Sequence, residues 1–444
     1  MDQAENHLVV VNDTDQGPHL HTRSHDAIIR PLLILLIALA ASLPAQVDPG
    51  GPDTALAWNQ WRGAQRDGLS PDTGLATDWP DGGPSLLWKV DGLGLGFSSV
   101  AFAGQRIFTM GQVRGAAHLF CLDLSDGAVQ WSARIGASGG SRQPGPRATP
   151  STDGKLVFGL GYDGELACLA AESGEEKWRK NLYDEFDGEI MSGWGYSESP
   201  LLDGDLVLVT PGGSAGSVVA LNKTSGALVW QSGELTDEAA YSSLVPAVIN
   251  GTRQYIVLTA RSVAGIAATD GGLLWRGAFR GSTAVCATPI YRDGFVFVTA
   301  AYSVGCKAFK VTEADGQFQV SDLYAGMQLQ NHHGGVVAVD GHVYGFGRRN
   351  LKCIEIESGE VLWENRSVGK GSITYADGHL IVRGEAGRAS VALVAATPTG
   401  YVEKGRFDQP DRTGVEAWAH PVVFGGKLYI RDQGILLCYD LRSN

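Results

Sequence analysis

The sequence lacks the features by which most enzymes and nucleic-acid-binding proteins are recognised. Its 444 residues carry a formal charge of −13 and contain no basic run, which opposes non-specific binding to nucleic acid or anionic lipid. The six cysteines include neither a Cys-x-x-Cys motif nor a vicinal pair, so no disulfide framework is predicted. No Gly-x-Ser-x-Gly elbow, P-loop or His-Glu-x-x-His motif occurs. A sustained helical period is also missing, and we therefore predict an all-β protein.

Glycine, in contrast, is abundant, and its placement is periodic. A glycine followed four residues later by tryptophan occurs at Gly226 and Trp230 and returns along the chain. The other occurrences are 127/131, 174/178, 271/275 and 359/363, with weaker forms at Gly316/Val320 and Gly400/Lys404 and a lone tryptophan at Trp88. These positions define eight units of roughly 45 residues, which is the period of a β-propeller blade.

Each unit also contains a hairpin signal. Asp203 and Gly204 separate two apolar runs, and Asp-Gly or Asn-Gly pairs take the same place in several other units. Such pairs favour a tight turn between two antiparallel strands. A unit therefore consists of three strands followed by the tryptophan strand, which predicts four-stranded blades.

The two ends of the repeat region are expected to pair. The last unit begins near His420 and stops at Arg442, before a tryptophan strand could follow. Residues 84–90, which contain Trp88, supply a strand of this kind at the other end of the chain. Pairing the first strand with the last closes a ring of sheets and removes exposed edges. The predicted fold is an eight-bladed β-propeller whose last blade is closed by an N-terminal strand.

Four of the cysteines occupy one position of the repeat. They are Cys121, Cys168, Cys353 and Cys438, and Ala220 takes the same position in another unit. A site that accepts either cysteine or alanine is typical of a small buried residue. We therefore interpret these cysteines as core residues rather than as bridges or ligands.

Differences in composition divide the chain into three segments. Residues 1–45 form a leader in which Arg30 precedes a short apolar run that ends at Ala45. That run is too short for a typical membrane span and has the length of a signal-peptide core. Cleavage is expected after Ala45 or Ala40, and an uncleaved anchor is the alternative. Residues 46–83 are interpreted as a strap across the repeats, and residues 84–444 as the propeller. We thus expect a periplasmic or secreted monomer with no stable membrane span after cleavage.

A candidate site follows from the geometry of a propeller. The residues that precede each innermost strand are equivalent by repeat, so they surround one mouth of the axial channel. Most are small, and the large polar exceptions are Arg147, Tyr196, Glu198, Tyr241, Asn331, His332, His333, Lys370 and His420. A mouth with these side chains suits a small polar or anionic ligand.

The adjacent histidines raise the question of a metal. Neighbouring residues of an extended strand point to opposite faces, so His332 and His333 are not expected to bind one ion together. A metal held by one of them with His420 and Glu198 is an alternative. The favoured interpretation is that one histidine bonds between blades and the other faces the channel.

Several stretches resemble a known family. They are Trp-Arg-Gly at 61–63, Arg-Asp-Gly at 66–68, Trp-Gly-Tyr-Ser-Glu-Ser-Pro at 194–200, Asn-His-His-Gly-Gly at 331–335, and the segments 369–378 and 405–412. Together with the glycine-tryptophan repeat, they make residues 84–442 similar to the pyrroloquinoline-quinone (PQQ)-binding-like β-propeller repeat proteins of planctomycete-type bacteria. That resemblance implies a tryptophan that docks between neighbouring blades.

Two groups of relatives imply two different functions. Quinoprotein alcohol dehydrogenases place PQQ over a vicinal disulfide and hold Ca²⁺ with Glu, Asn and Asp beside a catalytic Asp, and this chain has no vicinal cysteines. The outer-membrane assembly-factor propeller is a non-catalytic scaffold. We therefore expect an exported, non-catalytic binding or scaffold protein of the cell envelope, with a small ligand or an envelope protein as partner. The alternative is a PQQ- and Ca²⁺-dependent alcohol dehydrogenase, and a third is a metal-assisted enzyme built on His332, His333 and His420.

Overall fold

The computed structural model describes residues 58–140 and 143–442. The leader predicted for residues 1–45, with its signal peptide, lies outside the described residues, as do residues 46–57 of the predicted strap. The chain divides into a unit of residues 1–50 and a unit of residues 51–444, and the fold described here belongs to the second.

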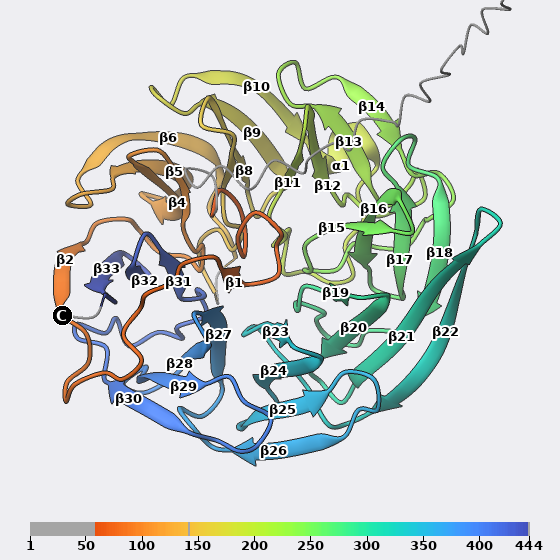
Figure 1. Cartoon of the computed structure of the whole chain (residues 1–444). Coiled ribbons are helices and arrows are strands. Elements are labelled where there is room, and N and C mark those ends of the chain that lie inside the picture. Colours follow the sequence, from red (N-terminus) through yellow and green to blue (C-terminus); the bar gives the residue numbers. More distant parts are fainter. Residues whose placement is uncertain (1–57, 141–142, 443–444) are drawn as a thin grey trace, which may run out of the picture. The chain divides into compact units, whose positions relative to one another are not determined.

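Eight antiparallel sheets surround a central axis, and their colours follow the sequence around the ring (Figure 1). The first four are β3 (Ala101–Ala103), β4 (Arg106–Val113), β5 (Ala116–Asp123) and β6 (Val129–Ala137); β7 (Ser151–Thr152), β8 (Leu156–Leu160), β9 (Glu165–Ala170) and β10 (Glu176–Asn181); β11 (Leu201–Asp203), β12 (Leu206–Val209), β13 (Val219–Asn222) and β14 (Leu228–Gln231); and β15 (Val245–Ile249), β16 (Thr252–Leu258), β17 (Ser262–Ala267) and β18 (Leu273–Ala278).

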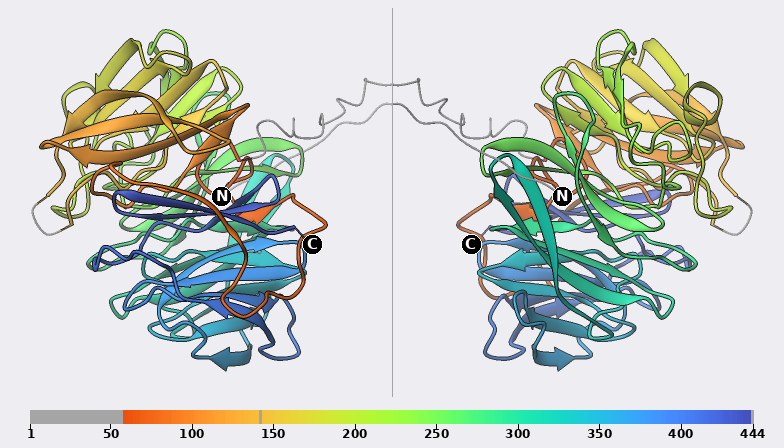
Figure 2. Two further views of the ribbon diagram at one scale, coloured as in Figure 1. Left: turned by 90° about the vertical axis from the view of Figure 1, so that its left-hand side faces the viewer. Right: turned by 90° about the vertical axis from the view of Figure 1, so that its right-hand side faces the viewer.

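The remaining four sheets continue the ring, which Figure 2 shows from two sides. They are β19 (Ile290–Arg292), β20 (Phe295–Ala300), β21 (Gly305–Ala314) and β22 (Gln317–Gly326); β23 (Val336–Val339), β24 (His342–Phe346), β25 (Leu351–Glu355) and β26 (Val361–Asn365); β27 (Gly371–Ala376), β28 (His379–Gly384), β29 (Val391–Ala395) and β30 (Glu403–Phe407); and β31 (Val422–Phe424), β32 (Lys427–Asp432), β33 (Ile435–Asp440) and β2 (Leu86–Val90). The described chain has one short helix, α1 (Leu182–Phe186). The predicted all-β, eight-bladed propeller is confirmed.

The ring closes as the sequence predicts. Strand β2 pairs antiparallel with β33, and Trp88 lies opposite Cys438. The orange β2 lies beside the dark blue β33 in Figure 1. The first strand of the repeat region therefore completes the sheet formed by the last three strands.

In four of the repeats, the tryptophan packs on the turn glycine of the next blade. A Cβ atom added to Gly271, whose φ is +77°, would lie 2.5 Å from Cε3 of Trp230. At Gly174 the added atom would lie 2.7 Å from Cε3 of Trp131. Only glycine leaves room for this contact and accepts the left-handed backbone conformation. The Gly-x-x-x-Trp spacing thus records how neighbouring blades pack.

Two of the weaker repeats differ from the prediction. In the fifth sheet the paired strands β21 and β22 extend further than in the other blades, so Tyr324, not Val320, lies opposite the small residue Ala308 and packs on Gly359. In the seventh sheet the register places Gly405 opposite Leu393.

In the seventh sheet, the strap residue Trp79 lies against Gly405. A Cβ atom on Gly405 would lie 2.5 Å from the Cβ of Trp79, whose backbone N–H donates to the carbonyl of Lys404 at 2.8 Å. The aromatic ring that packs toward the next blade is that of Phe407 in β30, which contacts Gly83 and lies 5.6 Å from the ring of Trp79.

The repeat cysteines are buried, as expected. Cys121 lies opposite Trp131 and Cys353 opposite Trp363, in the same register as Ala220 and Trp230. All six cysteines are free. Their common position beneath a tryptophan explains why only small side chains occur there.

The described part of the strap threads the centre of the ring. The N–H of Phe102 in β3 donates to the carbonyl of Trp58 at 2.9 Å, and that of Thr152 in β7 donates to Asn59 at 2.9 Å. Strand β1 (Leu69–Ser70) runs parallel to β27, on its inner side. The strap thus bonds to innermost strands of several blades, and its place near the axis is visible in Figure 1.

Candidate functional site

A cavity of about 250 Å³ lies where the loops preceding the innermost strands converge. Its lining is mostly aromatic and polar: Trp61, Phe97, Gln143, Arg147, Trp194, Ser197, Ser199, Tyr241, Ser243, Ala284, Cys286, Tyr302, His332, His333 and Trp418. We call it the mouth cavity. Most of these residues belong to the ring of loops that the repeat register places around one end of the channel, while Trp61 comes from the strap.

Arg147 provides a cation in this cavity. Its Nη1 donates to the carbonyl of Trp194 at 2.9 Å, and its Nη2 donates to the carbonyl of Gln143 at 3.0 Å. Its guanidinium carbon stands 5.2 Å from the centre of the Tyr162 ring. Burial lowers the pKa of Arg147, but a guanidinium stays protonated at neutral pH. Since its partners are neutral carbonyls and a ring, the positive charge remains available to a ligand.

A second cation stands behind His332. The Lys370 ammonium lies 2.5 Å from His332 Nδ1 and 2.8 Å from an oxygen of Glu385. The other ring nitrogen, Nε2, is 2.7 Å from the hydroxyl of Tyr302. Burial and, to a lesser extent, Lys370 lower the pKa of His332 to about 3. The neutral imidazole thus accepts from the lysine at Nδ1 and donates from Nε2 to the tyrosine.

The two histidines lie side by side, which corrects the prediction that they point apart. The ring centroids of His332 and His333 are 3.4 Å apart, and the ring of His333 is 4.0 Å from that of Trp418. The prediction assumed an extended strand, but both residues lie in the loop between β22 and β23. The alternation of strand side chains does not apply there.

Two of the predicted site residues are buried in the structure below the cavity. Tyr196 donates its hydroxyl to the carbonyl of Pro211 at 2.8 Å. Glu198 accepts from the N–H of Thr210, and burial raises the pKa of Glu198 to about 7. Buried Arg66, whose pKa burial lowers to about 9, acts on Glu198 from the strap.

Asn331 and His420 hold the histidine loop in place. The Asn331 amide donates to the carbonyls of Gly335 and Phe346 at 2.9 and 3.0 Å, and its oxygen accepts from the N–H of Gly335 at 3.0 Å. His420 Nε2 lies 2.8 Å from the carbonyl of His333. The structure therefore brings Arg147, Tyr241, His332 and His333 into the cavity, with Lys370 behind them, and sets the other four beneath it.

Several lining residues were absent from the predicted site. Phe97, Cys286 and Trp418 stand in the predicted ring of loops, but the prediction rests on large polar side chains and does not include them. Tyr302 follows β20 and Trp61 belongs to the strap, and no repeat register points to either of them. Searching the ring for aromatic as well as polar side chains finds Phe97 and Trp418.

Comparisons with known proteins agree with this architecture. Residues 139–315 match the PQQ_2 family model, which is described as outer membrane protein assembly factor BamB. No curated protein sequence matches the chain. The crystal structure of BamB from Moraxella catarrhalis is similar over 81% of this chain and 98% of its own, with 16% identity and a TM-score of 0.56.

Two further structures share the fold. A quinohemoprotein alcohol dehydrogenase, ADHIIG from Pseudomonas putida, matches 88% of this chain and 81% of its own at 11% identity and a TM-score of 0.50. The computationally designed Ika8 protein matches 80% of this chain and 99% of its own at 12% identity and a TM-score of 0.54. At these identities the likeness establishes the fold and not an activity.

The fold and its repeats define an eight-bladed, all-β propeller built from glycine-tryptophan hairpins. The chain has a PQQ-like β-propeller fold, similar in architecture both to BamB and to a quinohemoprotein alcohol dehydrogenase. Within residues 58–140 and 143–442, no helix is long and apolar enough to cross a membrane.

The mouth cavity does not fit the Ca²⁺-bound quinone that the dehydrogenase resemblance implies. Ca²⁺ takes oxygen ligands, largely carboxylates, but the described lining contains no Asp, Glu or Asn. Cys286 is the one cysteine among these residues, so a disulfide platform is missing as well. The described lining also lacks a carboxylate that could act as a base.

Proposed function

We propose that this protein is exported and acts as a non-catalytic binding protein of the cell envelope, which holds a small anionic ligand in the mouth cavity. One observation carries the proposal. The cavity combines the available charge of Arg147 with the rings of Trp61, Phe97, Trp194 and Trp418, and its described lining contains no carboxylate. Aromatic walls with a single fixed cation favour a planar, negatively charged molecule.

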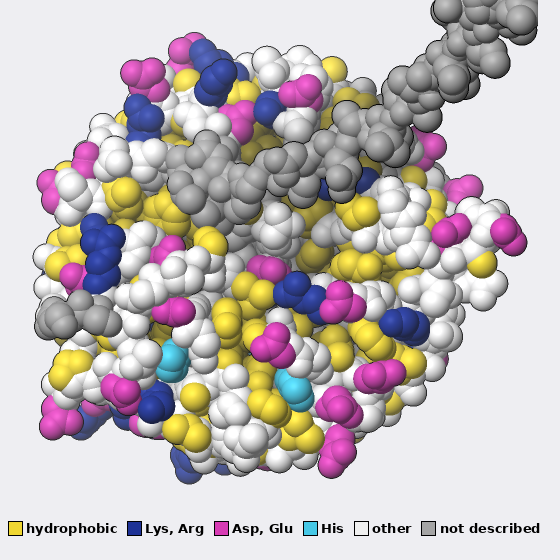
Figure 3. Space-filling model, in the orientation of Figure 1, with side chains coloured by type: hydrophobic (Ala, Val, Ile, Leu, Met, Phe, Trp, Pro, Cys, Tyr) yellow, Lys and Arg dark blue, Asp and Glu magenta, His cyan; other side chains and the backbone are white. Residues whose placement is uncertain are grey.

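The place of action is inferred from the leader and from the fold. The apolar run that ends at Ala45 has the length of a signal peptide core. The structural likeness to BamB supports an envelope protein as a second partner, bound through the loops around the mouth. On the face shown in Figure 3, the Lys and Arg side chains of the described residues are interspersed with Asp and Glu, which is consistent with no role in nucleic-acid binding.

Binding of two probes to the mature protein tests the proposal. The probes are PQQ, with and without Ca²⁺, and benzene-1,3,5-tricarboxylate, each followed by thermal shift and by calorimetry. We expect saturable binding that does not depend on Ca²⁺, and no alcohol-dependent reduction of an artificial electron acceptor. Arg147→Ala should weaken binding about 10-fold or more, since a charge-assisted bond is lost. The exposed Arg348→Ala variant is the control.

Two results would change the assignment. Ca²⁺-dependent PQQ binding together with alcohol oxidation would favour the dehydrogenase alternative. Binding that is equal in the Arg147→Ala and Arg348→Ala variants would remove the mouth cavity as the ligand site.

A further inference from the structure

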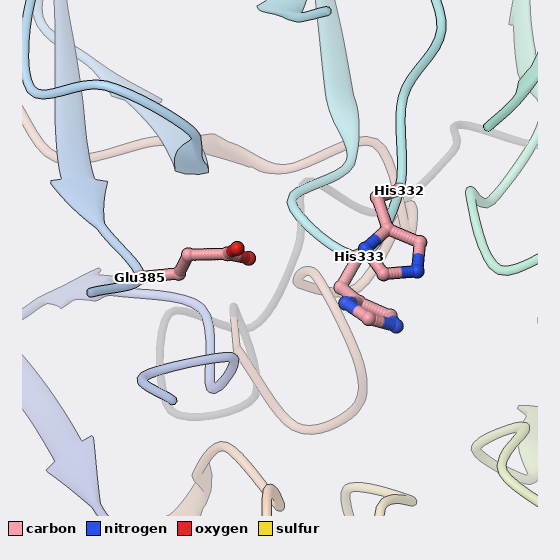
Figure 4. A group of neighbouring side chains, drawn as sticks. All are labelled: His332, His333 and Glu385. Carbon is pink, nitrogen blue, oxygen red and sulfur yellow. The ribbon is translucent and has the colours of Figure 1, made fainter. Parts of the chain in front are cut away.

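Two imidazoles and a carboxylate converge beside the mouth cavity. One ligand atom each of His332, His333 and Glu385 lies within 4.8 Å of the other two. The histidines come from the loop before β23, and Glu385 follows directly after β28 in the next blade. In Figure 4 the carboxylate of Glu385 points across the gap toward both imidazoles. The three side chains are thus aimed at one another by two separate elements.

His333 offers the nitrogen of this cluster that is available as a ligand, since both ring nitrogens of His332 contact Lys370 and Tyr302. The Nδ1 atom of His333 is buried and has no hydrogen-bond partner among the described residues. A buried polar atom without a partner is costly, and a metal ion would satisfy it.

A positive charge already occupies this place. The Lys370 ammonium contacts both His332 Nδ1 and Glu385, at 2.5 and 2.8 Å. A cation therefore bridges His332 and Glu385, two of the three side chains. Lysine carries its charge on a flexible four-carbon stem, so the ammonium can withdraw toward solvent without movement of the backbone.

The donor set is typical of one class of metal. Two histidines and one carboxylate are a ligand set of zinc sites that keep a fourth position open, and imidazole nitrogen suits Zn²⁺ better than Ca²⁺. Ligand atoms of a tetrahedral zinc lie about 3.4 Å apart, given bonds of about 2.1 Å. Side-chain rotations that move the ligand atoms by roughly 1 Å would bring them to that spacing. Both histidines line the mouth cavity, so the open position would face it.

We propose that His332, His333 and Glu385 bind a divalent transition metal of the Zn²⁺ type, in exchange for the Lys370 ammonium. The inference deepens the proposed function and rests on it in one respect, namely that the metal would add a second fixed cation to the ligand-binding cavity. Metal binding itself is measured without any organic ligand.

Calorimetry with Zn²⁺ and absorption spectra with Co²⁺ test the site on the mature protein. We expect one metal ion per chain and a tetrahedral Co²⁺ spectrum. His333→Ala and Glu385→Gln should each weaken binding at least 10-fold, while His118→Ala, which changes a histidine in β5, should not. Lys370→Met should strengthen binding at least 10-fold because the competing charge is gone. His333→Gln replaces His333→Ala if the alanine variant does not fold.

The contrary outcomes are distinct. Equal Zn²⁺ affinity in the wild-type protein and the His333→Ala variant would overturn the proposal. Binding by the Lys370→Met variant alone would also overturn it, and would leave Lys370 as the resident cation. Probe binding in the presence of EDTA separates the two hypotheses: if it persists and depends on Arg147 while Zn²⁺ does not bind, the metal site is wrong and the proposed function stands.

Discussion

Glu198 is the acidic residue among those predicted to surround the channel mouth, and its environment disfavours the ionised carboxylate. The side chain is 1% exposed, and burial raises its pKa to about 7 although Arg66 acts in the opposite direction. One carboxylate oxygen has no hydrogen-bond partner among the described residues. Desolvation therefore outweighs the attraction of the arginine, and the protonated form is favoured in the folded protein below about pH 7.

Replacing Glu198 with glutamine should flatten the pH dependence of stability. Between about pH 4.5 and 7 the folded protein keeps a proton that the unfolded chain has released, so the stability of the wild type falls as the pH rises through this window. The change is on the order of 1–3 kcal/mol. We expect Glu198→Gln to be more stable than the wild type at pH 8 and to vary less with pH. Urea denaturation at pH 5 and 8 measures this.

The exposed Glu172→Gln variant is the control for that measurement. If Glu198→Gln and wild type lose the same stability between pH 5 and 8, Glu198 does not carry the raised pKa.

The sequence predicts which residues lie near the mouth cavity where their positions follow from the repeat. Arg147 and Tyr241 precede innermost strands, and the register alone places them at the mouth. Burial cannot be read from that register, which is why Asn331 and His420 were assigned to the mouth although they lie beneath it. The pairing of His332 with His333 depends on a loop conformation that no residue period encodes.

At the scale of the blade, stability depends on contacts between neighbouring sheets. Trp230 is 8% exposed, packs on Gly271 of the next blade and donates its Nε1–H to the carbonyl of Ala268 at 3.3 Å. Trp230→Ala removes the ring and leaves a cavity between two sheets. We expect a loss of about 3–5 kcal/mol in the free energy of unfolding, measured by chemical denaturation.

A residue of the same strand serves as the control. Leu228 is 52% exposed, so Leu228→Ala should cost less than about 1 kcal/mol. Equal losses for the two variants would mean that the tryptophan does not hold the blades together.

Packing between neighbouring blades also explains why the aromatic position expected from the sequence is wrong in two blades. The long hairpin of β21 and β22 shifts the aromatic residue to Tyr324, and in the seventh sheet Phe407 packs on Gly83 while Trp79 of the strap lies against Gly405. A fixed spacing from a turn glycine cannot anticipate either change, since hairpin length and chain crossing are set by tertiary packing. The number of blades was nevertheless predictable. The five regular glycine-tryptophan pairs fix the repeat period, and that period also locates the units that lack such a pair.

At the scale of the whole molecule, two features of the N-terminal region act separately. The strap binds the inner strands, whereas β2 closes the ring by pairing with β33. Without β2, the apolar residues Leu436 and Leu437 of β33 would lose their neighbouring strand, and Gly127 would lose its contact with Trp88. An unpaired apolar edge of this kind favours aggregation.

Moving the closing strand β2 to the other end of the chain tests whether the strap or β2 stabilises the ring of blades. A chain of residues 92–442 lacks both the strap and β2, and we expect it to aggregate or to melt at a much lower temperature than a chain of residues 58–442. Placing residues 84–91 after residue 442, through a short glycine linker, makes the last blade a continuous four-stranded sheet like the others. The hydrogen bonds between β2 and β33 do not depend on the order in which the strands are connected. This permuted chain should therefore be monomeric in light scattering and show a cooperative melting transition. If it behaves like residues 92–442, the contacts of the strap along the axis, and not the closure of the ring, hold the eight blades together.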